Sequence, residues 1–392
     1  EGAARLRGGD RSWAAAHDRG AAVAVRAAGG SAAGGAGPAP SGPGPLARAG
    51  RFLASNFLPV GLVAATAAAV ACQGPGLVFA RIGLQRFTTA GIFIISGLSM
   101  RGGETAEATR AVGAIAYGLA AILLLTPLAA FLVLRMPVQP EALVLGLAVF
   151  LCMPTTLSSG ISLTTLARGN TALALLLTVA SNMLGVLSIP FVLSVVLGAG
   201  MGVRIPPWPM LLSLIRSVLL PVVLGVALRT FVPAVARACD ANKARLSTLS
   251  TCLLITVPYT QVSTAVSKGI SPGLVPLVQI TAIAVAVHVV YLVTNAGALA
   301  ALRVGGRDAE KARGVRRAVI LVASQKTLPI AITVLQRMGA YLGESAGLSV
   351  IPCISAHLAQ IIVDSFLVSH WNLQDALRAS SAEGPGGPSK AV

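Results

Sequence analysis

A cluster of hydroxyl side chains interrupts one of the most apolar stretches of the chain. Residues 153–165 read MPTTLSSGISLTT, in which Pro154 removes a helical hydrogen-bond donor and Gly160 weakens a helix. Freed carbonyls and hydroxyls beside such a break are groups that coordinate alkali cations. We expect a broken helix with Ser158 and Ser159 as candidate ion-binding residues. The alternative is a kinked packing helix with small residues at a helix interface.

The next apolar segment presents three polar residues together. Thr178 and Asn182 are i,i+4 neighbours on a helix, and Ser181 lies beside them. One such residue would be a routine interhelical hydrogen bond, but three beside a broken helix indicate a cavity wall. Thr178 and Asn182 are therefore added to the candidate ion-binding residues.

A second polar interruption occurs at residues 324–329, SQKTLP, which again pair polar groups with a proline. Gln325 lies within this second interruption. Lys326 falls in the middle of the segment, where a lysine must find an anion, carbonyls or water, or lose its proton. The alternative is that its side chain snorkels to the membrane surface.

The last apolar segment carries His357, Gln360 and Asp364, whose spacing places them on one helical stripe. With Lys326 they are the candidate substrate-binding or charge-compensating residues. Asp364 is the only acid deep in an apolar segment, so we expect it to neutralise Lys326; alternatively it faces water near the membrane surface. Three further polar residues are interpreted as packing groups: Gln261, His288 and Asn295.

The elements that carry these residues are long uncharged helices. Of the 392 residues, 55% are hydrophobic and only 11% are charged, whereas soluble proteins carry roughly 25% charged residues. A bilayer core is crossed by about 20 apolar residues in a helix. The runs without Asp, Glu, Lys or Arg are residues 52–80, 111–134, 142–167, 169–203, 246–267 and 269–302. They lack strand-like alternation, so the chain is predicted to be an all-α polytopic membrane protein.

Ten apolar segments are expected, and they divide as five plus five. They span residues 55–73, 87–100, 111–134, 142–166, 170–198, 209–231, 247–267, 272–302, 317–337 and 345–371. An odd number of helices in each half inverts one half relative to the other, and the two breaks then fall at matching positions, the fourth and ninth segments. The loops on one side hold more than twice as many Lys and Arg residues as those on the other, which places both termini in the cytosol-like compartment.

The domain boundaries follow from composition. Residues 1–50 are rich in Ala, Gly, Ser, Pro and Arg, which is typical of an organellar transit peptide or, alternatively, a disordered tail. Residues 51–200 and 201–373 are the two five-helix repeats. Residues 374–392 are expected to be a disordered tail.

The motifs together resemble one family. Residues 152–160 (CMPTTLSSG), 166–170 (LARGN), 324–329 (SQKTLP) and 356–360 (AHLAQ) resemble the bile acid:sodium symporter family. The branch is that of the fourth-type plastid sodium/metabolite cotransporters and the seventh human bile-acid carrier homologue. The resemblance implies inverted five-helix repeats, a core and a panel domain, and sodium bound where the fourth and ninth helices cross. It assigns sodium binding to Thr178 and Gln325.

The chain departs from the family at two places. A family glutamate in the ninth-helix break is missing from residues 321–324, LVAS, and a family serine is replaced by Ala174. Lys326 adds a positive charge instead, and a cation close to a fixed ammonium is electrostatically unfavourable. We hypothesise that Lys326 stands in for a bound cation or acts as a proton carrier.

The expected function is secondary transport of a small organic anion across a plastid envelope membrane, with Na⁺ or H⁺ as the coupling ion. The alternatives are a membrane regulator of calcium or ion homeostasis that transports nothing, and a cation/proton exchanger of similar architecture. No enzyme signature such as GxSxG, HExxH or a Walker A sequence occurs, so no catalytic residue, cofactor or further metal is expected. The expected partners are the solute and membrane lipid, not nucleic acid.

Overall fold

The computed structural model describes residues 57–100, 111–202, 205–267, 269, 273–306, 308–342 and 347–382. The described helices belong to one compact unit, Asn56–Val392. The expected transit peptide or tail at residues 1–50 lies outside the described residues. The last helix continues to Ala382, past the domain boundary expected at residue 373.

Helices fall in every segment that the hydropathy pattern indicates. In the first half they are α3 (Phe57–Ala71), α4 (Gly74–Arg81), α5 (Leu84–Ser99), α7 (Val112–Ala120), the π-helical turn η1 (Ala121–Leu125), α8 (Leu128–Val133), α9 (Glu141–Leu151), α10 (Ser159–Leu166) and α11 (Thr171–Met201). In the second half they are α12 (Pro207–Leu214), the π-helical turn η2 (Ile215–Leu219), α13 (Leu220–Phe231), α14 (Pro233–Ala241), α15 (Lys243–Ser267), α16 (Leu274–Ala301), α17 (Ala309–Ser324), α18 (Leu328–Leu342) and α19 (Val350–Ala382).

The described part of the chain contains no β-strand, and the prediction of an all-α polytopic membrane protein is confirmed. Seven described spans are long and apolar enough to cross a membrane, or eight if α3 and α4, bent by 99°, are one span. The segments that fall short are α5, with 16 residues, and α9 with α10, which are separated by a break. The count of ten therefore stays a prediction.

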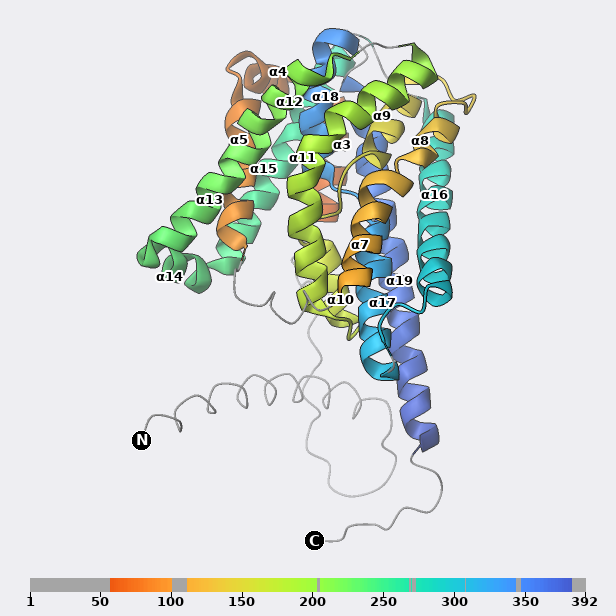
Figure 1. The fold of residues 1–392 in the computed structure, drawn as a ribbon. Coiled ribbons are helices and arrows are strands. Elements are labelled where there is room, and N and C mark those ends of the chain that lie inside the picture. The colour runs from red at the N-terminus through yellow and green to blue at the C-terminus, as the bar shows by residue number, and fades with distance from the viewer. Residues whose placement is uncertain are drawn as a thin grey trace, which may run out of the picture. The chain divides into compact units, whose positions relative to one another are not determined.

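The helices pack in two groups, each of which takes corresponding segments from both predicted halves. The first two segments of each half pack together, with α5 against α13 and α15, and α3 against α15 (Figure 1). The last three segments of each half form the second group, in which α9 packs on α19 and α17 packs on α10, α11 and α16. The assignment of these two groups to a panel and a core domain stays a prediction.

The ninth segment is the most enclosed of the membrane spans. In the apolar window of Ala309–Gly339, 94% of the residues are buried, against 28–50% in the other six long spans. In α9, every residue from Ala142 to Leu151 is also buried. Because irregular backbone is tolerated at membrane depth only inside protein or along a cavity, these are the places where breaks can be accommodated.

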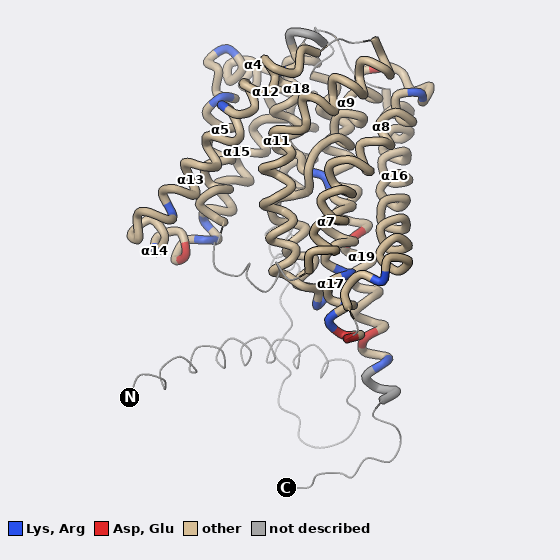
Figure 2. Tube along the Cα trace, viewed as in Figure 1, with Lys and Arg blue, Asp and Glu red and all other residues tan. Residues whose placement is uncertain are grey.

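Charged residues gather mainly toward the ends of the described helices, around α14 and around the lower ends of α17 and α19 (Figure 2). Many large apolar side chains between these ends are exposed, including Leu124, Phe191, Val195, Leu220 and Val293. In water this surface would be unfavourable, but in lipid it faces an apolar solvent. The structure therefore agrees with an integral membrane protein whose few interior charges need individual partners.

Candidate functional site

The segments at two helix breaks are hydrogen-bonded to each other at the centre of the second group of helices. The first break lies between α9 and α10, and the second between α17 and α18. The backbone N–H of Thr327 donates to the carbonyl of Pro154 at 2.9 Å, and the Thr155 hydroxyl donates to the Val322 carbonyl at 2.5 Å. Because α10 packs on α17 while α9 packs on α18, the two broken spans cross at this point.

Gln325 joins the two breaks through its side-chain amide, which is fully buried. Its Oε1 accepts from the hydroxyls of Thr156 at 2.6 Å and Ser159 at 3.0 Å. Its Nε2 donates to Oδ2 of Asp364 at 2.6 Å. The neutral amide of Gln325 thus connects the hydroxyls at the first break to the carboxylate of Asp364 on α19.

Asp364 lies against His288, a residue that the sequence analysis treats as a packing group. His288 Nδ1 lies 3.2 Å from the Ser324 carbonyl. His288 Nε2 lies 2.8 Å from Asp364 Oδ1, which is hydrogen-bond distance. The carboxylate of Asp364 is thus held between His288 and Gln325.

Lys326 is fully buried, and its ammonium has three acceptors for its three donors. They are the Met153 carbonyl at 2.8 Å, the Ile122 carbonyl at 3.0 Å and the Thr126 hydroxyl at 2.5 Å. None of the three is charged. The expected ion pair between Lys326 and Asp364 is therefore wrong, because Asp364 is engaged by Gln325 and His288 instead.

The π-helical turn η1 explains why a helical carbonyl is available to Lys326. In an α-helix the Thr126 N–H would bond to Ile122, but here it bonds to the carbonyl of Ala121 at 2.9 Å. The next residue, Pro127, has no N–H to donate. The Ile122 carbonyl consequently accepts from side chains, namely Lys326 and the Thr126 hydroxyl at 2.9 Å.

Two residues of α19 hold the backbone of the second break. Gln360 Oε1 accepts from the Lys326 N–H at 2.9 Å, and Gln360 Nε2 donates to the Lys326 carbonyl at 2.7 Å. His357 Nδ1 lies 3.0 Å from Gln360 Nε2 and 3.4 Å from the same carbonyl. The structure confirms that His357, Gln360 and Asp364 share one stripe, but the first two contact the peptide of Lys326 and not its ammonium.

Unpartnered oxygens surround the first break. The hydroxyls of Thr178 and Thr327 and the Asn182 Oδ1 are buried, with no hydrogen-bond partner among the described residues. The Asn182 amide is oriented by bonds to the carbonyls of Thr155 at 3.1 Å and Thr178 at 2.8 Å. Buried polar atoms without a hydrogen-bond partner are rare in folded proteins, and each one lowers the stability of the fold. Neutral oxygens with free lone pairs are the ligands that hard cations take, so the donor set fits an alkali ion.

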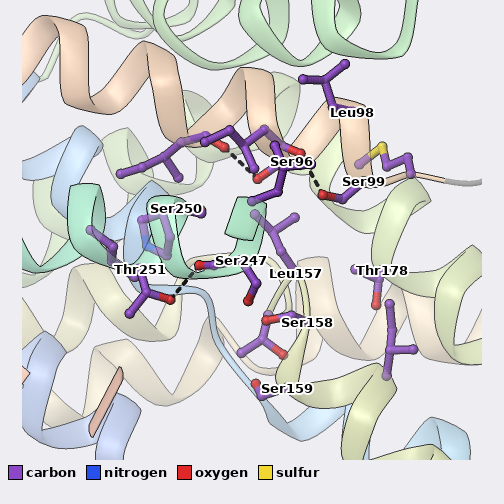
Figure 3. Close-up of a pocket in the computed structure, with 18 of the residues that line it drawn as sticks. Ser96, Leu98, Ser99, Leu157, Ser158, Ser159, Thr178, Ser247, Ser250 and Thr251 are labelled. Carbon is purple, nitrogen blue, oxygen red and sulfur yellow. Dashed lines mark hydrogen bonds between the residues drawn. The ribbon is translucent and has the colours of Figure 1, made fainter. Parts of the chain in front are cut away.

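A cavity of about 420 Å³ opens beside these oxygens, between the two helix groups. Ser158, Ser159, Thr178 and His357 line it from the second group, and serines and threonines of α5 and α15 line it from the first (Figure 3). Ser158 is the residue before α10, and its hydroxyl makes no capping bond. At the cavity wall Arg229 pairs with Asp240 at 3.0 Å. The cavity thus combines a largely apolar surface with several hydroxyls, and its volume suits a compact solute.

The crossed breaks, the enclosed charges and the adjoining cavity define an α-helical membrane carrier. A family model, the SBF-like CPA transporter family, matches residues 56–373. The chain belongs to this family.

Named relatives come from plants and animals. "Probable sodium/metabolite cotransporter BASS4, chloroplastic" from Oryza sativa subsp. indica is 42% identical over 327 residues, covering 83% of this chain and 77% of the relative. The Arabidopsis thaliana protein of that name is 40% identical over 324 residues, covering 82% and 73%. "Sodium/bile acid cotransporter 7-A" from Xenopus laevis is 26% identical over 328 residues, covering 81% and 91%. The expected family resemblance is confirmed.

The sequence reasoning missed three contributors to the site. Thr156 was seen only as part of the hydroxyl cluster, although it contacts Gln325 directly. His288 was read as a lone packing residue, although it lies against Asp364. Thr126 was not singled out. The signal for it is a threonine followed by Pro127 inside an apolar run, a pattern that frees carbonyls within a helix.

Proposed function

We propose that the protein is a secondary active transporter of a small organic anion in a plastid envelope membrane, with both termini on the stromal side. The observation that carries the proposal is the buried ammonium of Lys326 where the two broken spans cross. Lys326 is buried, and its ammonium contacts three neutral acceptors and no carboxylate. Lys326 does not line the cavity of about 420 Å³ itself, but the next residue, Thr327, does. An uncompensated positive charge this close to the cavity favours an anionic solute. The names of the plant relatives support a metabolite as solute and a chloroplast as location.

The coupling ion is proposed to bind at the unpartnered oxygens of Thr178 and Asn182, with Ser158, Ser159 and Gln325 nearby. These atoms are neutral, so a bound Na⁺ gains ion–dipole interactions without a carboxylate ligand. Lys326 then supplies a fixed positive charge at a second position, where it replaces a mobile cation. The transport cycle would then move one coupling ion together with the anion.

Uptake by proteoliposomes tests this function. The purified protein is reconstituted and challenged with a panel of labelled mono- and dicarboxylates, under an inward Na⁺ gradient or an equal K⁺ gradient. We expect Na⁺-driven accumulation of at least one anion by the wild-type protein. Lys326→Gln should lose most of the uptake, while Lys243→Gln, which alters an exposed lysine at the cavity, should keep it. If Lys326→Gln retains both uptake and its sodium dependence, the role given to Lys326 is wrong.

The buried contact between Asp364 and His288 favours one second candidate, a cation/proton exchanger. Asp364 is fully buried and reaches the crossing through Gln325. A carboxylate that can exchange a proton for a cation is what such a mechanism requires. Dissipation of a preset pH gradient by added Na⁺ or K⁺ in the absence of any organic anion, abolished in Asp364→Asn, would support the exchanger. A protein that moves neither anions nor protons would instead be a regulator.

A further inference from the structure

A second cavity, of about 500 Å³, is lined by three arginines. Arg86 lies in the first turn of α5, Arg216 lies in η2, and Arg337 lies in α18. No Asp or Glu of the described residues lines this cavity, and none of the three arginines has a hydrogen bond or ion pair to a described residue. Arg86 and Arg337 are near enough for their charges to repel. Three guanidinium groups therefore converge here without compensation.

Two neutral features of the cavity point the same way. The N-terminal end of α5 adds the positive end of its helix dipole beside Arg86. Thr89, only 5% exposed, also lines the cavity, and its hydroxyl makes no hydrogen bond within the described structure. The hydroxyl is therefore open to the cavity and free to donate to an occupant. An oxyanion would accept hydrogen bonds from this hydroxyl and from the guanidinium groups at the same time.

The second cavity lies in line with the first along the boundary between the helix groups. A narrow space of about 10 Å³ separates them, lined mainly by apolar residues. Thr89 borders this space and the second cavity, while Ile92, Leu254 and Pro329 border it and the first. Along α5, Arg86 and Ser99 are about 20 Å apart at 1.5 Å per residue. The two cavities are thus opposite ends of one interrupted passage.

We propose that Arg86, Arg216 and Arg337 form an oxyanion site that holds a carboxylate or phosphate group of the transported solute at the second end of this passage. The inference rests on the proposed function and specifies the chemistry of its solute. Arginine is suited to the role because its planar fork binds carboxylate and phosphate in a bidentate manner. The site gives the solute a charged partner on the far side of the apolar constriction from Lys326.

Anion-dependent thermal stabilisation in detergent tests the site without requiring flux. The probes are inorganic phosphate and succinate, with sodium chloride at matched ionic strength as the reference. We expect both anions to raise the melting temperature of the wild-type protein above that in chloride. Arg86→Gln/Arg337→Gln should weaken the apparent affinity at least tenfold. Arg81→Gln/Arg135→Gln removes the same charge from exposed arginines that line neither cavity, and it should bind as the wild type does.

Two further outcomes would overturn the site, and a third would separate it from the proposed function. Equal weakening in both double variants would show general electrostatics instead of a site. Stabilisation by phosphatidylglycerol nanodiscs over phosphatidylcholine nanodiscs, with none by the free anions, would assign the arginines to lipid headgroups. A protein that transports no anion yet keeps arginine-dependent binding of phosphate or succinate would retain the site and refute the proposed function.

Discussion

The contact between Lys326 and Thr126 gives the sharpest single prediction. Thr126→Val removes the hydroxyl that accepts from the ammonium at 2.5 Å while keeping the shape of the side chain. The other two acceptors, the carbonyls of Ile122 and Met153, remain in place. The variant therefore leaves a buried ammonium with one unsatisfied donor.

The size of the effect follows from that loss. A hydrogen bond to a charged group contributes about 1.5–3 kcal/mol, and we expect Thr126→Val to lower the free energy of unfolding by about 2 kcal/mol. In a Lys326→Met background the ammonium is gone, and the same change removes only the hydroxyl bond to Ile122 within the helix. The cost should then fall below ~1 kcal/mol. The coupling energy between the two sites is therefore about 1–2 kcal/mol.

A double-mutant cycle measured by denaturant unfolding in mixed micelles tests this value. Thr333→Val is the matched control, because Thr333 is equally buried but its hydroxyl bonds to the Pro329 carbonyl of its own helix at 2.8 Å. Its coupling to Lys326→Met should stay below ~0.5 kcal/mol. A coupling near zero for Thr126 and Lys326 would refute the placement of the ammonium between the two breaks and η1.

Two further predictions concern the frame that holds the site. A methyl group added at Gly97 would meet the backbone of α13, so Gly97→Ala should lower the melting temperature by several degrees, whereas Gly297→Ala, which meets nothing within 4 Å, should leave it unchanged or raise it. Arg317, 6% exposed, bonds to Asp375 at 2.7 Å and 3.0 Å, so Arg317→Met should destabilise by about 3–5 kcal/mol in denaturant unfolding. The half-exposed Arg313 pairs with the same carboxylate, and Arg313→Met should cost under ~1 kcal/mol. Similar losses for Arg317 and Arg313 would contradict this assignment.

The fold was largely predictable because membrane-spanning helices can be recognised in a sequence as long runs without charged residues. The two breaks were predictable as well, since Pro154 and Pro329 each fall among hydroxyl or amide residues in otherwise apolar segments. The stripe of α19 followed from helical spacing alone. What hydropathy does not resolve is a short or interrupted span such as α9 and α10, and this is why the count of ten stays a prediction.

The partners of the buried charges were not predictable. Lys326 and Asp364 have opposite charges and lie near the same crossing, so pairing them is the simplest electrostatic guess. The guess is wrong because acceptors other than carboxylates can satisfy an ammonium, and here a π-helical turn frees one of them. A local departure from α-helical hydrogen bonding depends on tertiary packing, and residue types give little sign of it.

The missing family glutamate illustrates the same point. Residues 321–324 contain no acid, which led to the expectation that a cation site would lack a carboxylate. The structure supplies a carboxylate from another helix, since Asp364 reaches the second break through Gln325 at 2.6 Å. Asp364 also contacts His288, whereas Lys326 contacts only neutral acceptors and has no carboxylate partner.

The central claim is that the charge of Lys326 at the crossed breaks makes the protein an anion carrier. The most direct measurement is the uptake of a labelled organic anion by proteoliposomes containing the wild-type protein, Lys326→Gln or Lys326→Arg, at fixed Na⁺ gradient. The account predicts uptake by the wild type, a loss of at least tenfold in Lys326→Gln, and partial retention in Lys326→Arg, which keeps the charge. Undiminished anion uptake by Lys326→Gln would contradict it.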